Sequence, residues 1–164
     1  WPRAASPVAW IAADGNDAAI VIDGQEIPMK PGQRLYATQP WAQHRGFTLT
    51  ADVDAAAAAQ RAAFDCDRKG CVPIGDHRPA IGAWWTKRAP STARLNELCA
   101  RSDILILRAA SPPPAACRGV LVLDRAAFER GGAAEVFATK RGWRVDWSQP
   151  LRGDRPWTVN GNGG

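Results

Sequence analysis

Short apolar runs separated by turn-forming residues set the pattern of the first part of the chain. Val8–Ala12 and Ala18–Ile22 are apolar, and Asp14–Asp17 between them reads Asp-Gly-Asn-Asp. Two apolar runs around such a turn predict a β-hairpin at the start of the fold. Residues 33–37, which read Gln-Arg-Leu-Tyr-Ala, are expected to add a third strand.

Helical patterns occur at residues 50–61, 92–101 and 124–130. The first offers Thr50 as an N-cap, followed by acidic residues and a run of alanines, which favour a helix start and a helix interior. The second begins after Ser91, another N-cap residue, and repeats apolar positions at helical spacing. The third is short and ends at a Gly-Gly pair, so the sequence predicts two or three helices.

Two unbroken apolar runs, Ile104–Leu107 and Val120–Leu123, are typical of strands covered on both faces. They are therefore expected at the centre of a sheet, with residues 80–86 as a further strand. Ser111–Pro114 contains three consecutive prolines, which continue neither a helix nor a β-ladder. An exposed loop is therefore expected between the two runs.

The last pattern is a pair of strands at residues 133–138 and 143–147 around a Lys-Arg-Gly turn. In the second strand Trp143, Val145 and Trp147 alternate with polar residues and are expected on one face. Together the elements predict an α/β chain of α+β character with mixed sheet strands.

The 164 residues fit a single domain, expected over residues 1–157, with a flexible tail over residues 158–164. A hydrophobic content of 46% is that of an ordinary globular protein. No apolar run approaches the roughly 20 residues of a spanning helix. Because the chain begins at Trp1, we expect it to be part of a longer or processed protein.

Four cysteines form two pairs along the chain. Cys66 and Cys71 are placed to face each other across a hairpin, whereas Cys99 and Cys117 bracket a strand and the proline loop. An even count in a compact chain favours two disulfides and an oxidising compartment such as a bacterial periplasm. A four-cysteine zinc site and unpaired thiols are the alternatives, although only the first pair approaches the spacing of a zinc knuckle. Four cysteines permit three pairings, so the connectivity stays open.

The chain carries 21 Lys and Arg residues against 16 Asp and Glu residues, and its net charge of +5 permits anionic partners. It also contains eight tryptophans, some of which alternate with basic residues near the C-terminus. Such mixtures stack and hold single-stranded nucleic acid, although core packing is the simpler explanation of the tryptophans. The candidate DNA contacts are Lys140, Arg141, Arg144, Arg152 and Arg155.

Acid–base chemistry has few candidate residues. His44 and His77 are the two histidines of the sequence, neither has a histidine partner nearby, and a surface role is expected for both. No phosphate-binding glycine loop, serine elbow or His-Glu-His helix motif occurs. The chain therefore lacks an evident catalytic constellation.

Carboxylates are the remaining candidates for a metal site. Asp52 with Asp54, and Asp65 with Asp67, are pairs of oxygen donors of the kind that Mg²⁺ accepts. The first pair also suits a helix N-terminus, and the second is expected to face solvent in the cysteine hairpin. Asp124 ends a predicted strand, and helix capping explains it equally well.

Several segments resemble the soluble C-terminal region of alphaproteobacterial ComEC-type competence proteins, which are inner-membrane channels for imported single-stranded DNA. The segments that carry the resemblance are Gly15-Asn16, Arg45–Phe47, Phe64–Val72, Cys99–Leu107, Ala116–Phe128, Gly131–Phe137 and Arg155–Trp157. Together they are spread over most of the chain.

The resemblance implies a reduced metallo-β-lactamase-like layered domain, proposed in that family as a nuclease for the non-transported strand. A working member would need a His-x-His-x-Asp-His motif, because two metal ions activate water and hold the phosphate. The sequence contains no such motif. Nuclease activity is therefore not carried over, and neither a cofactor nor a catalytic residue is expected.

From the resemblance we expect a non-catalytic accessory domain of a DNA-uptake channel, on the periplasmic face of the inner membrane. Trp1–Arg3 would join it to a preceding membrane helix. Its partners would be single-stranded DNA, the remainder of the same channel protein and other DNA-uptake components. The alternatives are a divergent divalent-metal nuclease acting on the non-transported strand, and a disulfide-stapled interaction module unrelated to competence.

Overall fold

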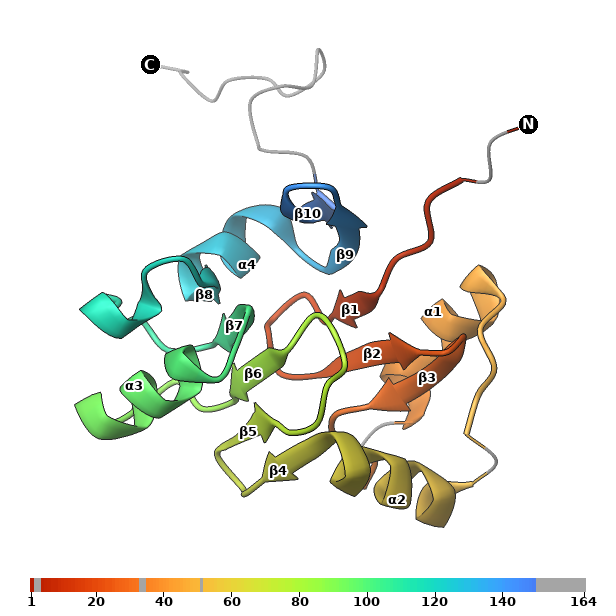
Figure 1. The fold of residues 1–164 in the computed structure, drawn as a ribbon, viewed down its shortest axis with the longest axis horizontal. Coiled ribbons are helices and arrows are strands. Elements are labelled where there is room, and N and C mark those ends of the chain that lie inside the picture. Colours follow the sequence, from red (N-terminus) through yellow and green to blue (C-terminus); the bar gives the residue numbers. More distant parts are fainter. Residues whose placement is uncertain (2–3, 33–34, 51, 150–164) are drawn as a thin grey trace, which may run out of the picture.

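Two five-stranded β-sheets and four α-helices form the part of the chain that the computed structural model describes, which is residues 1, 4–32, 35–50 and 52–149 (Figure 1). The strand orders are β10-β9-β1-β2-β3 and β4-β5-β6-β7-β8. The strands are β1 (Ala9–Ile11), β2 (Ala18–Ile22), β3 (Gln25–Pro28), β4 (Phe64–Cys66), β5 (Gly70–Pro73), β6 (Ile81–Trp84), β7 (Ile104–Leu107), β8 (Leu121–Asp124), β9 (Ala134–Thr139) and β10 (Gly142–Trp147). The helices are α1 (Leu35–Arg45), α2 (Val53–Ala63), α3 (Thr92–Ala100) and α4 (Arg125–Gly131), with a short 3-10 helix η1 (Ala115–Cys117). The class is mixed α and β, as the sequence predicts, but with four α-helices instead of two or three.

The first sheet is antiparallel throughout. The hairpin predicted around Asp14–Asp17 forms its centre, because Ala9 of β1 lies opposite Ile20 of β2 on one side and Val136 of β9 on the other. The predicted closing hairpin is present as β9 and β10. β3, which the sequence pattern did not predict, extends the sheet beyond β2.

The second sheet contains both strand directions. β4, β5 and β6 are antiparallel, whereas β6, β7 and β8 are parallel, with Trp84, Leu107 and Asp124 side by side in the register. β7 is buried at every position, as its apolar run predicts. β8 lies at the edge of the described sheet instead of its centre, and its Leu121 and Val122 are half-buried. The expectation of two central strands is therefore wrong for β8. Its Leu123 is buried in the main core, whereas Leu121 and Val122 pack at the rims of the two cores.

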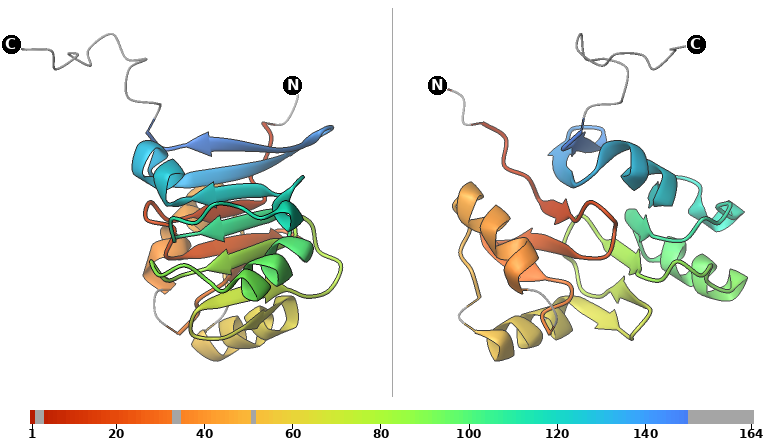
Figure 2. Two further views of the ribbon diagram at one scale, coloured as in Figure 1. Left: turned by 90° about the vertical axis from the view of Figure 1, so that its left-hand side faces the viewer. Right: turned by 180° about the vertical axis from the view of Figure 1, so that it is seen from behind.

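The inner faces of the two sheets pack against each other and form the main core (Figure 2). Ile20 of the first sheet is 2% exposed and Ile106 of the second is fully buried. On the outer face of the first sheet, Trp41 of α1 stacks on Trp10 of β1 with 6.3 Å between the ring centroids. Two sheets and an outer helix therefore follow one another as layers.

A second, smaller core lies between the second sheet and α3. Leu98 and Cys99 of α3 belong to one buried cluster with Leu105 and Leu107 of β7. α2 lies beside β3 and β4, and α4 lies beside β8, so these helices close the sides of the two sheets (Figure 1). The order of the layers is helix, sheet, sheet, helix, and the relation to metallo-β-lactamase-like domains stays a prediction.

α1 takes the place of the third strand expected over residues 33–37. Residues 33 and 34 lie outside the described part, and residues 35–37 open the helix, so the strand prediction is wrong. Pro40 lies inside α1. Proline has no N–H to donate to a helix, so the sequence pattern did not predict a helix here. Contact with the first sheet compensates, since the indole N–H of Trp41 donates to Glu135 of β9 at 2.9 Å. Gly46 follows the helix with φ of 76°, a left-handed value that suits glycine.

Side-chain caps fix the starts of the other three helices. Asp52 caps α2 by accepting the N–H of Ala55 at 2.8 Å, so the cap predicted at Thr50 is wrong by two residues. Ser91 caps α3, as predicted. Asp124 caps α4, so helix capping, one of the two explanations of this residue, is confirmed.

Two disulfides join Cys66 to Cys71 and Cys99 to Cys117. The first connects neighbouring residues of β4 and β5, with Cα atoms 4.1 Å apart. The second ties α3 to η1, with Cα atoms 4.9 Å apart. This pairing uses all four thiols and leaves none for the zinc alternative.

No helix in the described residues is long and apolar enough to cross a membrane. The boundary expected at residue 157 for the single domain lies beyond Gln149, the last described residue, and stays a prediction. The tail expected over residues 158–164 lies outside the described part of the chain.

Removal of the second disulfide is expected to destabilise the fold more than removal of the first. In the loop-closure description, a crosslink over 18 positions contributes about 3 kcal/mol and one over 5 positions about 2 kcal/mol. The double variant Cys99→Ala with Cys117→Ala should therefore lower the free energy of unfolding by about 3 kcal/mol in urea titrations.

The matched control is the double variant Cys66→Ala with Cys71→Ala, for which a smaller loss is expected. Cys99 and Cys117 are both buried, at 2% and 6% exposure, whereas in the first pair Cys71 is buried and Cys66 is half-buried. Lost packing therefore adds more to the effect of the second pair. Equal losses in the two variants would contradict this ranking.

Glu26 of β3 is expected to make the fold less stable as the pH rises. It is fully buried, and neither carboxyl oxygen has a hydrogen-bond partner within bonding geometry. Burial raises its pKa, and the hydroxyl of Thr38 offsets this only in part. Its contribution to stability is therefore present below the unfolded-state pKa of about 4.3 and is lost as the pH rises through the folded-state pKa.

Glu26→Gln should consequently be more stable than wild type at pH 7, and the difference should disappear near pH 4. Each pH unit between the two pKa values corresponds to about 1.4 kcal/mol in the unfolding free energy. Urea titrations across this pH range measure the effect, with Glu129→Gln at an exposed helix position as the control. A difference that does not change with pH would speak against a raised pKa of the buried Glu26.

Candidate nucleic-acid interface

The carboxyl ends of the three parallel strands lie at one edge of the fold. Trp84, Leu107 and Asp124 end β6, β7 and β8 in register, so the residues that follow them come together in space. The β4–β5 turn lies beside them because Gly70 pairs with Trp84, and the β1–β2 turn reaches them through contacts with Arg108. Ligands of α/β sheets bind outside the carboxyl ends of the strands, so this edge is the candidate site.

Two hollows open at this edge, on either side of the loop that follows β6. The first has a volume of about 470 Å³ and is lined by Asp67, Lys69, Trp84, Thr86, Arg88, Ala89, Pro90, Ser91 and Arg94. The second has a volume of about 320 Å³ and is lined by Ala13, Asp14, Lys87, Arg108, Arg125, Phe128 and Glu129. The first hollow is lined by three cations and one carboxylate, and the second by three cations and two carboxylates. Both hollows therefore have an excess of positive charge and favour anions. We name these six cations the basic edge: Lys69, Arg88, Arg94, Lys87, Arg108 and Arg125.

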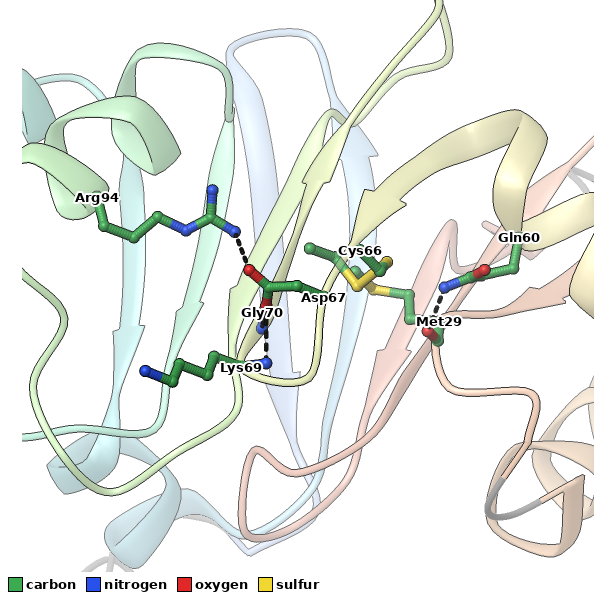
Figure 3. Close-up of a disulfide and its surroundings, with 8 residues drawn as sticks. Met29, Gln60, Cys66, Asp67, Lys69, Gly70 and Arg94 are labelled. Carbon is green, nitrogen blue, oxygen red and sulfur yellow. Dashed lines mark hydrogen bonds and ion pairs between the residues drawn. A yellow bond between two sulfur atoms is a disulfide. The ribbon is translucent and has the colours of Figure 1, made fainter.

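The β4–β5 turn is tied to α3 at the wall of the first hollow (Figure 3). Asp67 accepts the backbone N–H groups of Lys69 at 2.7 Å and Gly70 at 2.9 Å, and pairs with Arg94 at 3.4 Å. Burial alone would raise the pKa of Asp67, but the two N–H groups and Arg94 outweigh burial and lower it. Asp67 faces solvent, as expected for this hairpin, and its carboxylate also holds the turn and α3 together.

Arg108 organises the second hollow. Its guanidinium donates to the carbonyl oxygen of Trp85 at 3.2 Å and to the side-chain oxygen of Asn16 at 3.4 Å, and lies 3.6 Å from Asp14. Lys30 donates to the carbonyl and side-chain oxygens of Asn16 at 3.0 and 3.1 Å, and its ammonium group lies 5.0 Å from the centre of the Trp85 ring. Arg108 thus fastens the β1–β2 turn of the first sheet to the second sheet.

The cations predicted from the sequence are not part of this edge where they are described. Lys140 and Arg141 form the exposed turn between β9 and β10. Because β9 runs antiparallel to β1, this turn lies at the end of the first sheet opposite to Asp14–Asp17. Arg152 and Arg155 lie outside the described residues. The role of all four residues as DNA contacts stays a prediction.

The tryptophans of β10 pack toward the core. Trp143 and Trp147 contact the main core, and Trp147 meets the ring of Phe128 edge-on with 5.6 Å between centroids. On the other face of β10, the exposed Arg144 pairs with Asp146 at 3.0 Å. The predicted alternation along this strand is confirmed, and core packing explains both tryptophans.

The donor groups at this edge do not fit the two metal ions that the resemblance implies. The residues that follow β6, β7 and β8 are Trp85, Arg108 and Arg125. Across the described ranges, no three His, Cys, Asp or Glu side chains are grouped to hold a metal ion. Asp52 and Asp124 instead cap helices, so no reaction step is derived through a metal ion.

The two histidines lie away from the basic edge. His77 precedes β6, at the end of that strand opposite to Trp84, and its ring meets Phe64 with 5.5 Å between centroids. Burial, followed by the charge of Arg78, lowers the pKa of His77. His44 is exposed near the end of α1.

Comparisons with protein-family models, with characterised proteins and with solved structures give no match to this chain.

The sequence pattern did not single out the basic edge. Its members run from Lys69 to Arg125 and belong to five separate segments. Each follows a strand or stands near a helix start, but such positions are common. The parallel direction of β6, β7 and β8 and the antiparallel pairing of β5 with β6 bring them together, and neither strand direction nor strand pairing follows from the local sequence pattern.

Asp67→Asn is expected to lower stability at neutral pH and to have less effect in acid. Because the folded-state pKa of Asp67 is lowered, its contribution is present above the unfolded-state pKa of about 3.9 and is lost as the pH falls through the folded-state value. The side chain is 60% exposed, so solvent screening limits the loss to less than about 1 kcal/mol at pH 7.

Urea titrations at pH 7 and pH 3 measure the difference between variant and wild type. Asp65→Asn, which alters an exposed carboxylate of the same hairpin, is the control. A loss at pH 7 that persists unchanged at pH 3 would mean that the charge of Asp67 is not what holds the turn.

Proposed function

We propose that this chain is a non-catalytic accessory domain of a DNA-uptake channel and contacts single-stranded DNA through the basic edge. The observation that carries this proposal is the convergence of six cations from five segments around two hollows. The net charge of +5 and the resemblance to ComEC-type proteins support the same partner. The basic edge replaces the β9–β10 turn as the favoured contact because it is concave and gathers more charge.

The expected contact is electrostatic and weak. Trp84 and Trp85 are 6% and 4% exposed, so their rings do not offer open faces to nucleobases. Phosphate contacts without base stacking give sequence-independent binding that weakens strongly with salt. This behaviour suits a domain that guides a strand of any sequence past the mouth of a channel.

The two disulfides support a position on the periplasmic side. Such bonds persist in oxidising compartments and are rare in the cytosol of most bacteria. The remainder of the channel protein and other uptake components would then be the domain's neighbours. The cations at the ends of the parallel strands support a non-catalytic role, because a metal-dependent hydrolase needs anionic or neutral donors there.

Fluorescence anisotropy with a labelled single-stranded oligonucleotide tests the proposal. If three phosphates are neutralised, affinity should fall about 20-fold between roughly 50 and 200 mM salt. The double variant Lys87→Glu with Arg125→Glu should weaken binding about tenfold or more at low salt, because it reverses two charges of the second hollow.

The matched variant Lys140→Glu with Arg141→Glu changes one lysine and one arginine at the opposite end of the first sheet. Binding close to that of wild type is expected for it, whereas a larger loss than in the first variant would move the interface to the β9–β10 turn. Absence of binding even at low salt would remove the DNA role. Metal-dependent cleavage of the strand that disappears in Asp124→Asn would overturn the non-catalytic role.

A further inference from the structure

The first hollow combines cations with an apolar wall. Its charged lining comes from Lys69, Arg88 and Arg94, and its apolar lining from Trp84, Ala89 and Pro90. A volume of about 470 Å³ is within the usual range of small-molecule sites and exceeds what inorganic phosphate fills. The hollow therefore suits an anionic group that is attached to an organic body.

The charge of the hollow matches a dianion. Three cations and the Asp67 carboxylate leave an excess of two positive charges. Arg94 shares its charge with Asp67 and Glu97, whereas no ion pair to Lys69 or Arg88 occurs within the described residues. A phosphate monoester carries about −1.5 to −2 charges at pH 7, which is more than a carboxylate or a diester phosphate offers.

The backbone around the hollow is fixed before any ligand arrives. The indole N–H of Trp84 donates to the carbonyl oxygen of Arg88 at 2.7 Å, and the N–H of Trp85 donates to the carbonyl oxygen of Lys69 at 2.7 Å. The Cys66–Cys71 disulfide closes the hairpin that carries Lys69 (Figure 3). Such preorganisation lowers the entropy cost of binding.

Polar groups beside the apolar wall favour a nucleoside as the organic body. The hydroxyls of Thr86 and Ser91 and the carboxylate of Asp67 line the same hollow. Each already bonds within the protein, because Thr86 donates to the carbonyl oxygen of Arg88, Ser91 caps α3 and Asp67 accepts two backbone N–H groups. Each also keeps a free lone pair or hydroxyl hydrogen, which matches the hydroxyl and amide groups of a sugar and a base. Ser91 and Arg94 also lie at the start of α3, whose N-terminal dipole adds to the attraction for an anion.

We propose that the first hollow is a binding site for a nucleoside monophosphate, with the phosphate held by Lys69 and Arg88 and the nucleoside placed against the accessible Ala89 and Pro90. This small ligand would occupy the first hollow alone, whereas a DNA strand would bind along the whole basic edge. The same chemistry occurs in a free nucleotide and in the phosphorylated end of a strand.

Isothermal titration calorimetry of the full chain with thymidine 5′-monophosphate tests this site. Thymidine and inorganic phosphate should each bind at least tenfold more weakly, because each uses only one half of the hollow. The double variant Lys69→Ala with Arg88→Ala should weaken nucleotide binding at least tenfold, whereas Lys140→Ala with Arg141→Ala should leave it unchanged. Circular dichroism and urea titration verify that the variants are folded.

Equal binding of thymidine and its monophosphate, full binding by the Lys69 and Arg88 variant, or absence of binding at millimolar nucleotide would each overturn the inference. A short oligonucleotide with and without a 5′-phosphate then separates a strand end from a free nucleotide. Nucleotide binding and strand binding are measured separately, so each can fail without the other. Salt-dependent strand binding without nucleotide binding removes only this site, and nucleotide binding without strand binding removes only the DNA role.

Discussion

The face-to-face packing of the two sheets is the interaction on which the rest of the structure depends. Full burial of one large aliphatic side chain contributes about 1.5 to 3 kcal/mol, so the shared core outweighs any surface contact of the domain. Its inner isoleucines are Ile11, Ile20, Ile27, Ile81, Ile104 and Ile106. This packing also places the β1–β2 turn over the ends of β6 and β7, which allows Arg108 to bond Asn16 and Trp85 together. The candidate site is thus built by the core.

The two disulfides belong to different cores of the fold, since Cys71 is part of the main core. Cys99 and Cys117 belong to the smaller cluster outside the second sheet, where they tie the residues after the proline loop to α3. Cys66 and Cys71 close a hairpin of short strands next to the first hollow. The second crosslink therefore serves stability, whereas the first also fixes the turn in which Asp67 accepts two backbone N–H groups.

Local patterns predicted the local elements of this protein well. The opening hairpin, the cap at Ser91, the buried run Ile104–Leu107 and the closing hairpin follow from residues close in sequence. The predictions were wrong where tertiary contacts determine the secondary structure. The helix α1, for which a strand was predicted, tolerates Pro40 because contacts with the first sheet support it. The edge position of β8 and the basic edge depend on strand order and direction, which local periodicity does not contain.

The sign of the charge at the carboxyl ends of the parallel strands decides what this edge can bind. A metallo-hydrolase of the kind that the resemblance implies needs anionic or neutral donors there, whereas this chain has Lys87, Arg108 and Arg125. A divalent cation would be repelled by these groups, and the same field attracts phosphate. Arg108 is committed to contacts within the protein, so it sets the shape of the edge. Lys69, Lys87 and Arg88 have exposed side chains and no ion pair within the described part of the chain, and they are therefore the groups best able to neutralise an incoming phosphate.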